Sequence, residues 1–267
     1  MNNFGEIKMK EKLEEMFRKH GYSSKYQVDV MGRKVDVPVK YSDASALMVF
    51  FSISLKKAKN LLNSERLTPV SIFGNKCLLG ITFFDYRDCP VGPYHEFTFS
   101  IPVLVDSKFH IPFLPIIFDS FFKNFGYYVI LMGTDSDISR KHVEQIFPYP
   151  ILKRIISVDF DKGVNSLIVN VKDGHDEVMS ISAELPKDYR LERKGYNTYY
   201  SVGDKLYKVR LTAFSWQGGL SNIKNFEFTL GSNDISRKLK ELEVSMQPLK
   251  GFYHKIATEV LDGPEEV

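Results

Sequence analysis

Residues 86–103 read Tyr-Arg-Asp-Cys-Pro-Val-Gly-Pro-Tyr-His-Glu-Phe-Thr-Phe-Ser-Ile-Pro-Val. The proline and glycine residues at 90–93 are typical of a tight turn. From Phe97 to Val105 every second residue is apolar, which is the period-two signature of a half-buried strand. Glu96 begins the opposite, polar face, which Thr98 and Ser100 continue. The stretch therefore predicts a turn that delivers a carboxylate onto a strand whose other face is apolar.

Further strands are predicted in the second half of the chain. Residues 167–171 and 178–182 are rich in strand-forming side chains and flank the Asp173-Gly174 turn signal, which predicts a hairpin. Alternating patterns also cover residues 196–202, 206–214 and 226–230. Strands thus account for most of the regular structure that the sequence predicts.

Four helices are predicted among these strands. They cover about residues 4–19, a short segment that starts near Ser54 and ends before Pro69, residues 113–124 and residues 136–147. Helices that interrupt a strand-rich chain favour a mainly β protein with peripheral helices, of the α+β class, and not an alternating α/β sheet. We expect one domain over residues 1–267 with a β-barrel or β-sandwich at its centre.

Composition excludes several function classes. The 36 basic and 33 acidic residues give a net charge of only +3, and no basic block or arginine-rich stripe is present, so nucleic acid is not an expected partner. The two cysteines are not in a metal-binding or redox pair, and the six histidines are scattered, so we expect free thiols, a cytoplasmic location and no metal or cofactor. The chain shows neither a signal peptide nor an uninterrupted apolar span, so we expect a soluble protein without a membrane partner.

Three short segments together resemble the acetoacetate decarboxylase family. They are Gly-Pro-Tyr-His-Glu at 92–96, Gln-Ile-Phe-Pro-Tyr-Pro-Ile at 145–151, and Ala-Phe-Ser-Trp-Gln-Gly-Gly-Leu at 213–220. The family has Gly-Pro-Tyr-x-Glu, Glu-Ile-Trp-Gly-Tyr-Pro-Lys and Trp-Thr-Gly-Pro in these places. The matched segments occur in consistent order between about residues 46 and 231. The resemblance implies a β-barrel or sandwich around an apolar pocket, and a homo-oligomer.

The resemblance implies a reaction whose two lysines are replaced in this sequence. In the family, a lysine amine forms a Schiff base with a keto acid, and acetoacetate decarboxylase is itself a standard example of a lysine activated by its surroundings. Here Ile151 and Leu152 occupy the places of the family's adjacent lysines. Lys153 follows, but a shift of two residues displaces a side chain by roughly 7 Å along a strand. Lys153 is therefore either a displaced catalytic amine or a solvated strand end.

The resemblance also indicates the candidate site residues. They are Glu96 and Lys153 as catalytic groups, and Tyr94, Gln145, Tyr149, Ile151 and Trp216 as ligand-binding residues. Three hypotheses follow: an active lyase that uses Glu96 and an amine such as Lys153, a binding module for a small carbonyl or keto-acid-type ligand, and an enzyme that moves protons with Glu96 and forms no Schiff base.

The missing lysines carry a further prediction about the pocket. Without fixed cations, Glu96 should hold its proton more tightly, unless Arg210 reaches it. The pocket should then prefer uncharged carbonyl compounds to keto-acid anions.

Overall fold

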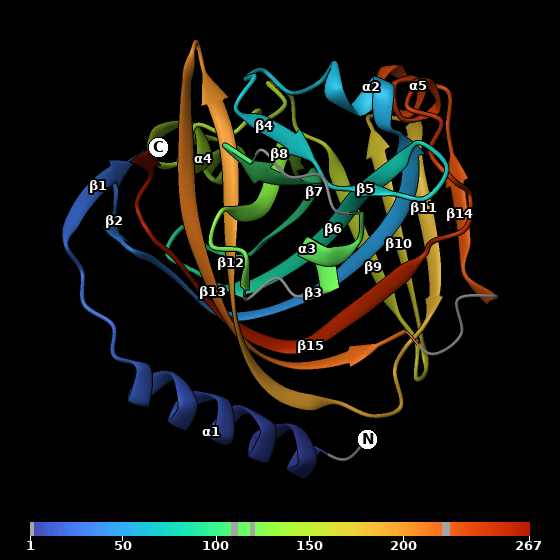
Figure 1. Ribbon diagram of the computed structural model, residues 1–267. Coiled ribbons are helices and arrows are strands. Elements are labelled where there is room, and N and C mark those ends of the chain that lie inside the picture. Colours follow the sequence, from blue (N-terminus) through green and yellow to red (C-terminus); the bar gives the residue numbers. More distant parts are fainter. Residues whose placement is uncertain (1–2, 108–111, 118–120, 221–224) are drawn as a thin grey trace.

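Seven strands form a closed barrel (Figure 1). The computed structural model describes residues 3–107, 112–117, 121–220 and 225–267. Around the ring the strands are β7 (Tyr94–Val105), β8 (Phe125–Thr134), β12 (Arg190–Val202), β13 (Lys205–Gly219), β15 (Lys250–Leu261), β3 (Val39–Ser54) and β6 (Lys76–Asp88). The pairing of β6 with β7 closes the ring. All pairs are antiparallel except β8 with β12, which is parallel and has only two register pairs, Thr198↔Tyr127 and Tyr199↔Tyr128.

A second sheet covers one side of the barrel. It contains β9 (Ser157–Lys162), β10 (Ser166–Asp173), β11 (Asp176–Glu184) and β14 (Glu227–Leu230), in the order β14-β11-β10-β9. A two-residue turn, Gly174 and His175, joins the end of β10 at Asp173 to β11, so the predicted hairpin is confirmed. Three short strands extend the barrel sheet, and two form a separate hairpin. The former are β4 (Leu67–Pro69), β5 (Ser71–Ile72) and β16 (Glu265–Glu266), and the latter are β1 (Tyr26–Val30) and β2 (Arg33–Val37).

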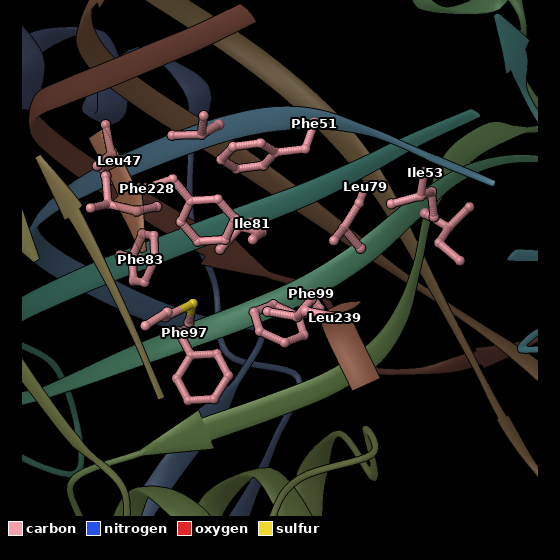
Figure 2. Close-up of a cluster of buried hydrophobic side chains, with 14 of the residues drawn as sticks. Leu47, Phe51, Ile53, Leu79, Ile81, Phe83, Phe97, Phe99, Phe228 and Leu239 are labelled. Carbon is pink, nitrogen blue, oxygen red and sulfur yellow. The ribbon is translucent and has the colours of Figure 1, made fainter. Parts of the chain in front are cut away.

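The main hydrophobic core lies between the outside of the barrel and this second sheet (Figure 2). Strand β7 contributes Phe97 and Phe99, both almost fully buried, and β14 contributes Phe228. Because side chains alternate along a strand, the barrel residues between these core positions must point to the opposite face, into the lumen. The strands that build the core therefore also line an interior space.

Helices surround the barrel and the second sheet. They are α1 (Asn3–His20), α2 (Leu55–Lys59), α3 (Leu114–Ile117), α4 (Asp137–Ile146) and α5 (Asp234–Glu241). Helix α1 lies across the outside of the barrel, where Leu13 packs against Phe214 of β13 and Ile256 of β15 (Figure 1). Ser136 caps α4 by accepting a hydrogen bond from the Ser139 backbone. No helix in the described part of the chain is long and apolar enough to cross a lipid bilayer.

Two helix predictions were wrong in length. Helix α2 ends at Lys59, because the backbone N–H groups of Leu61 and Leu62 then donate to the carbonyls three residues earlier, as in a 3₁₀ turn. In the predicted helix at 113–124 only Leu114–Ile117 is helical among the described residues, and residues 118–120 lie outside them. Phe113 has a positive φ of 61°, which excludes an earlier helix start.

Candidate functional site

The barrel encloses a cavity of about 110 Å³. An apolar cavity of about 150 Å³ holds a molecule the size of benzene, so this space suits a compound of only a few heavy atoms. Its walls are largely aromatic and aliphatic, with a few polar groups. The lining residues are Ala46, Met48, Phe50, Gly80, Thr82, Phe84, Tyr86, Glu96, Thr98, Ser100, Tyr127, Val129, Met132, Tyr149, Tyr196, Thr198, Leu211, Ala213, His254, Glu259 and Leu261.

Glu96 lines this cavity at the start of β7. Strand alternation turns Glu96, Thr98 and Ser100 inward, while Phe97 and Phe99 face the core, as the sequence pattern predicts. The Glu96 side chain accepts a hydrogen bond of 3.2 Å from Thr98 Oγ1, and the residue is only 5% exposed. Burial raises the pKa of Glu96 to about 8, helped by the charge of Glu259, while the Thr98 hydrogen bond opposes the rise. Glu96 is therefore a neutral carboxylic acid at pH 6.

Glu259 is a second cavity carboxyl group, which the sequence reasoning missed. It lies on β15, is 3% exposed, and accepts a hydrogen bond of 3.4 Å from the Tyr86 hydroxyl. Burial raises the pKa of Glu259 to about 7, against the lowering effect of Tyr86. One sequence feature could have indicated this buried position, namely the run Ile256-Ala257-Thr258-Glu259-Val260. A carboxylate in so apolar a strand is either buried or at the edge of a sheet.

His254 is an imidazole side chain that also lines the cavity. Its Nδ1 lies 2.8 Å from Ser215 Oγ, and burial together with the nearby charge of Lys194 lowers its pKa to about 4. The imidazole is consequently neutral at physiological pH. Sequence reasoning had treated His254 as one of six scattered histidines, because its partners come from distant strands.

Tyr149 reaches the cavity from the segment that follows α4. Its hydroxyl lies 2.6 Å from Thr198 Oγ1, which itself donates to the Val209 carbonyl. Because the Thr198 hydrogen is used in this way, the Tyr149 hydroxyl donates to Thr198. Burial raises the pKa of Tyr149, so this hydroxyl stays protonated.

Three predicted ligand contacts lie behind or outside the cavity wall. Tyr94 is buried, but it packs behind the wall against Tyr86, with 4.8 Å between the ring centroids. Ile151 is buried beside Met132, and Gln145 is exposed on α4. None of the three is among the residues that line the cavity.

Lys153 and Trp216 are also outside the lining, which corrects their expected positions. The Lys153 side chain is 80% exposed, and its Nζ lies 2.8 Å from Glu144 Oε1, so α4 holds the amine at the surface. Trp216 donates from Nε1 to the Met9 carbonyl at 2.9 Å and packs beneath α1 on the outside of the barrel. The indole is therefore unsuitable as a direct fluorescent reporter of the cavity.

The charges of the site follow from this arrangement. Among the described residues that line the cavity there is no lysine or arginine, and Arg210 belongs to a separate hollow. In the described part of the chain, no cluster of His, Cys, Asp and Glu side chains is placed to hold a metal ion. The cavity can therefore offer two carboxyl groups with raised pKa values, a neutral imidazole and several hydroxyls.

Comparison with solved structures identifies the architecture. The chain is similar to an acetoacetate decarboxylase (TM-score 0.61, 13% identity, 86% of this chain and 89% of the other). It is also similar to acetoacetate decarboxylase from Legionella pneumophila (TM-score 0.63, 12% identity, 94% of each chain). A third similar structure is the enduracididine biosynthesis enzyme MppR in complex with pyruvate (TM-score 0.54, 10% identity, 87% of this chain and 91% of the other).

Sequence comparison adds no family assignment. Neither a protein-family model nor a curated protein sequence matches the chain. At 10–13% identity the structural likeness establishes the fold. The chain has the acetoacetate decarboxylase-like fold, in a form whose sequence has diverged far from those of the similar structures.

Proposed function

We propose that this protein binds a small, uncharged carbonyl compound in the barrel cavity, with Glu96 and Glu259 as its polar contacts. The observation that carries the proposal is the pair of buried carboxyl groups in a wall without lysine or arginine among its described residues. A protonated carboxyl group can donate a hydrogen bond to a carbonyl oxygen. MppR, a protein of similar fold solved with pyruvate, supports only the carbonyl part of this choice, since pyruvate is an anion. The proposal that the ligand is uncharged rests on the cavity wall, whose described residues include no lysine or arginine.

The proposed site excludes anionic ligands on energetic grounds. An anion that leaves water needs a fixed cation or several donors to replace its hydration, and the described wall provides no lysine or arginine. Any ionised fraction of Glu96 or Glu259 would repel the anion further. Acetoacetate should therefore bind less well than an uncharged diketone of the same shape.

The same geometry supports proton transfer without a covalent intermediate. The pKa values of about 8 for Glu96 and about 7 for Glu259 leave one group mainly protonated and the other mainly ionised near pH 7.5. Glu259 would then accept a proton from the carbon next to the carbonyl, while Glu96 donates its proton to the carbonyl oxygen, which yields the enol. No Schiff base is involved, because Ile151 and Leu152 carry no amine and Lys153 is held at the surface.

Isothermal titration calorimetry at pH 6 tests the binding proposal. The ligands are 2,4-pentanedione and acetoacetate, which differ by a methyl group in place of the carboxylate oxygen. We expect the diketone to bind at least about tenfold more tightly, which corresponds to about 1.4 kcal/mol. E96M and E259M, which remove the hydrogen-bond donor and keep a side chain of similar length, should weaken binding of the diketone, whereas E65M, the same exchange at an exposed site, should not. Tighter binding of acetoacetate would contradict the proposal.

Hydrogen exchange tests the proton transfer. Exchange of the α-hydrogens of 2-butanone in D₂O, followed by NMR, should be accelerated by the wild-type protein at pH 7.5. E259Q should abolish the acceleration, because an amide cannot accept the proton. An acceleration that survives in both E96Q and E259Q would exclude these two groups as the acid and the base.

A further inference from the structure

A second hollow, of about 700 Å³, adjoins the cavity at one seam of the barrel. The two spaces share Tyr127 of β8 and Tyr196 of β12, whose ring centroids are 6.1 Å apart. We call this second hollow the seam groove. Its lining residues are Phe122, Lys123, Phe125, Gly126, Tyr127, Arg193, Lys194, Gly195, Tyr196, Asn197, Lys208, Arg210, Asp262, Gly263 and Glu265.

The seam is the least paired part of the ring. Strands β8 and β12 share two register pairs, whereas β12 and β13 are paired from Arg190↔Gln217 to Val202↔Lys205. Beyond the two pairs, the Asn197 side-chain amide holds the strands together by donating to the carbonyls of Lys123 and Phe125. Among the residues that the structure describes, Tyr127 and Tyr196 alone line both the cavity and the seam groove.

The seam groove is strongly cationic. Five of its lining residues are lysine or arginine, and two are acidic. Lys208 pairs with Glu265 at 2.9 Å, but no ion pair joins Arg193, Lys194 or Arg210 to any residue that the structure describes. The Arg210 guanidinium lies against Gly195, with Nη2 only 3.1 Å from the position that a Cβ would take there. A side chain at residue 195 would crowd the Arg210 guanidinium, so glycine at this position allows the guanidinium to lie in the groove.

Lys194 connects the groove electrostatically to the cavity. It shares the inward-facing parity of Tyr196 and Thr198 on β12, and both of these residues line the cavity. Its charge contributes to the lowered pKa of the cavity residue His254. Lys194 therefore places positive charge at the border between the seam groove and the cavity, although it does not line the cavity.

We propose that the seam groove holds an anionic group, such as a phosphate ester, of the same compound whose uncharged carbonyl end occupies the cavity. This inference rests on the proposed function, and it defines the ligand as a carbonyl compound with a remote anionic group. Guanidinium and ammonium groups are well suited to bind phosphate oxygens. Acetoacetate does not fit this description, because its carboxylate is too close to the carbonyl to remain outside the cavity.

Calorimetry with a matched pair of ligands tests the inference. The pair is 5-hydroxy-2-pentanone and its phosphate ester, 4-oxopentyl phosphate, and inorganic phosphate serves as the third probe. The phosphate ester should bind the wild-type protein at least about tenfold more tightly than the alcohol, as expected for one or more charge-assisted hydrogen bonds. K194Q and R210Q should reduce this ratio to below about twofold without weakening the alcohol. K172Q, which removes an exposed cation from the second sheet, should leave the ratio unchanged.

The outcomes separate this inference from the proposed function. Equal binding of ester and alcohol, or a ratio that persists in both K194Q and R210Q, would overturn the inference even if the alcohol binds in the cavity. Inorganic phosphate that binds as tightly as the ester would also overturn it, because the carbonyl end would then add nothing. If neither the alcohol nor 2,4-pentanedione binds, the proposed function fails. In that case, phosphate binding that K194Q and R210Q weaken would still support an anion site in the groove. Thermal unfolding of each variant confirms that it is folded.

Discussion

The buried carboxyl groups should make the protein less stable as the pH rises above neutrality. Glu96 is 5% exposed, and its pKa is raised from 4.5 to about 8 in the folded protein. The folded state therefore binds more protons than the unfolded state between these two pH values. The free energy of unfolding then falls as the pH increases through this window and levels off above the folded pKa. The same reasoning applies to Glu259, with an upper limit of about pH 7.

The magnitude follows from the width of the window. One pKa unit corresponds to about 1.4 kcal/mol, so ionisation of Glu96 between pH 6 and pH 9 should lower the free energy of unfolding by about 2–3 kcal/mol. Ionisation of Glu259 should remove about 1–2 kcal/mol more over the same interval. E96Q lacks the first of these effects. We therefore compare the free energy of unfolding of E96Q, relative to the wild type, at the two pH values. This relative stability should be about 2–3 kcal/mol higher at pH 9 than at pH 6.

Urea denaturation at pH 6 and pH 9, followed by far-UV circular dichroism, measures this difference. The wild type, E96Q, E259Q and the exposed control E65Q are compared in the same buffers. Comparison of the two pH values within each variant cancels any change in packing caused by the amide. A pH dependence of E96Q equal to that of the wild type would refute the reasoning, because Glu96 would then be ionised in the folded protein already at pH 6.

Three further substitutions test individual parts of the structure. K153A should leave binding of 2,4-pentanedione unchanged and cost less than about 1 kcal/mol of stability, because an exposed ion pair contributes little; a loss of binding in calorimetry would place this amine in the site. G133A should lower the free energy of unfolding by about 1–3 kcal/mol, since the added Cβ would lie 2.3 Å from Phe97 Cε1. Urea denaturation with an unchanged midpoint would contradict that close contact. Y149F should cost about 0.5–1.5 kcal/mol through loss of the hydrogen bond to Thr198, and a variant as stable as the wild type in the same assay would argue against this bond.

The strand pattern of β7 was predictable because local geometry determines it. Side chains alternate across any extended strand, so the apolar residues from Phe97 onward placed Glu96 on the opposite face without knowledge of the partners. The Asp173-Gly174 hairpin was predictable for a similar reason, since a two-residue turn specifies how its flanking strands pair. Neither alternation nor the short matched segments distinguished a barrel from a sandwich, because the closure depends on the pairing of β6 with β7.

The remainder of the site depends on long-range pairing. Glu259 and His254 enter the cavity because β15 pairs with β3 and β13, and no local pattern reports these partners. Trp216 was expected near a ligand, but α1 covers that side of the barrel and binds the indole instead. The position of Lys153 likewise depends on the residues before it, because Ile151 and Leu152 pair with Met132 of β8.

Carboxyl-carbon NMR tests the central claim most directly, namely that the barrel holds two carboxyl groups that are uncharged at pH 6. Protein labelled with ¹³C at glutamate Cδ is titrated between pH 4 and pH 10, and E96Q and E259Q assign the two resonances by their disappearance. We expect two signals that titrate near pH 7–8, with the Glu96 signal at the higher pH. Titration of both assigned signals near pH 4–5, as for exposed glutamates, would contradict it.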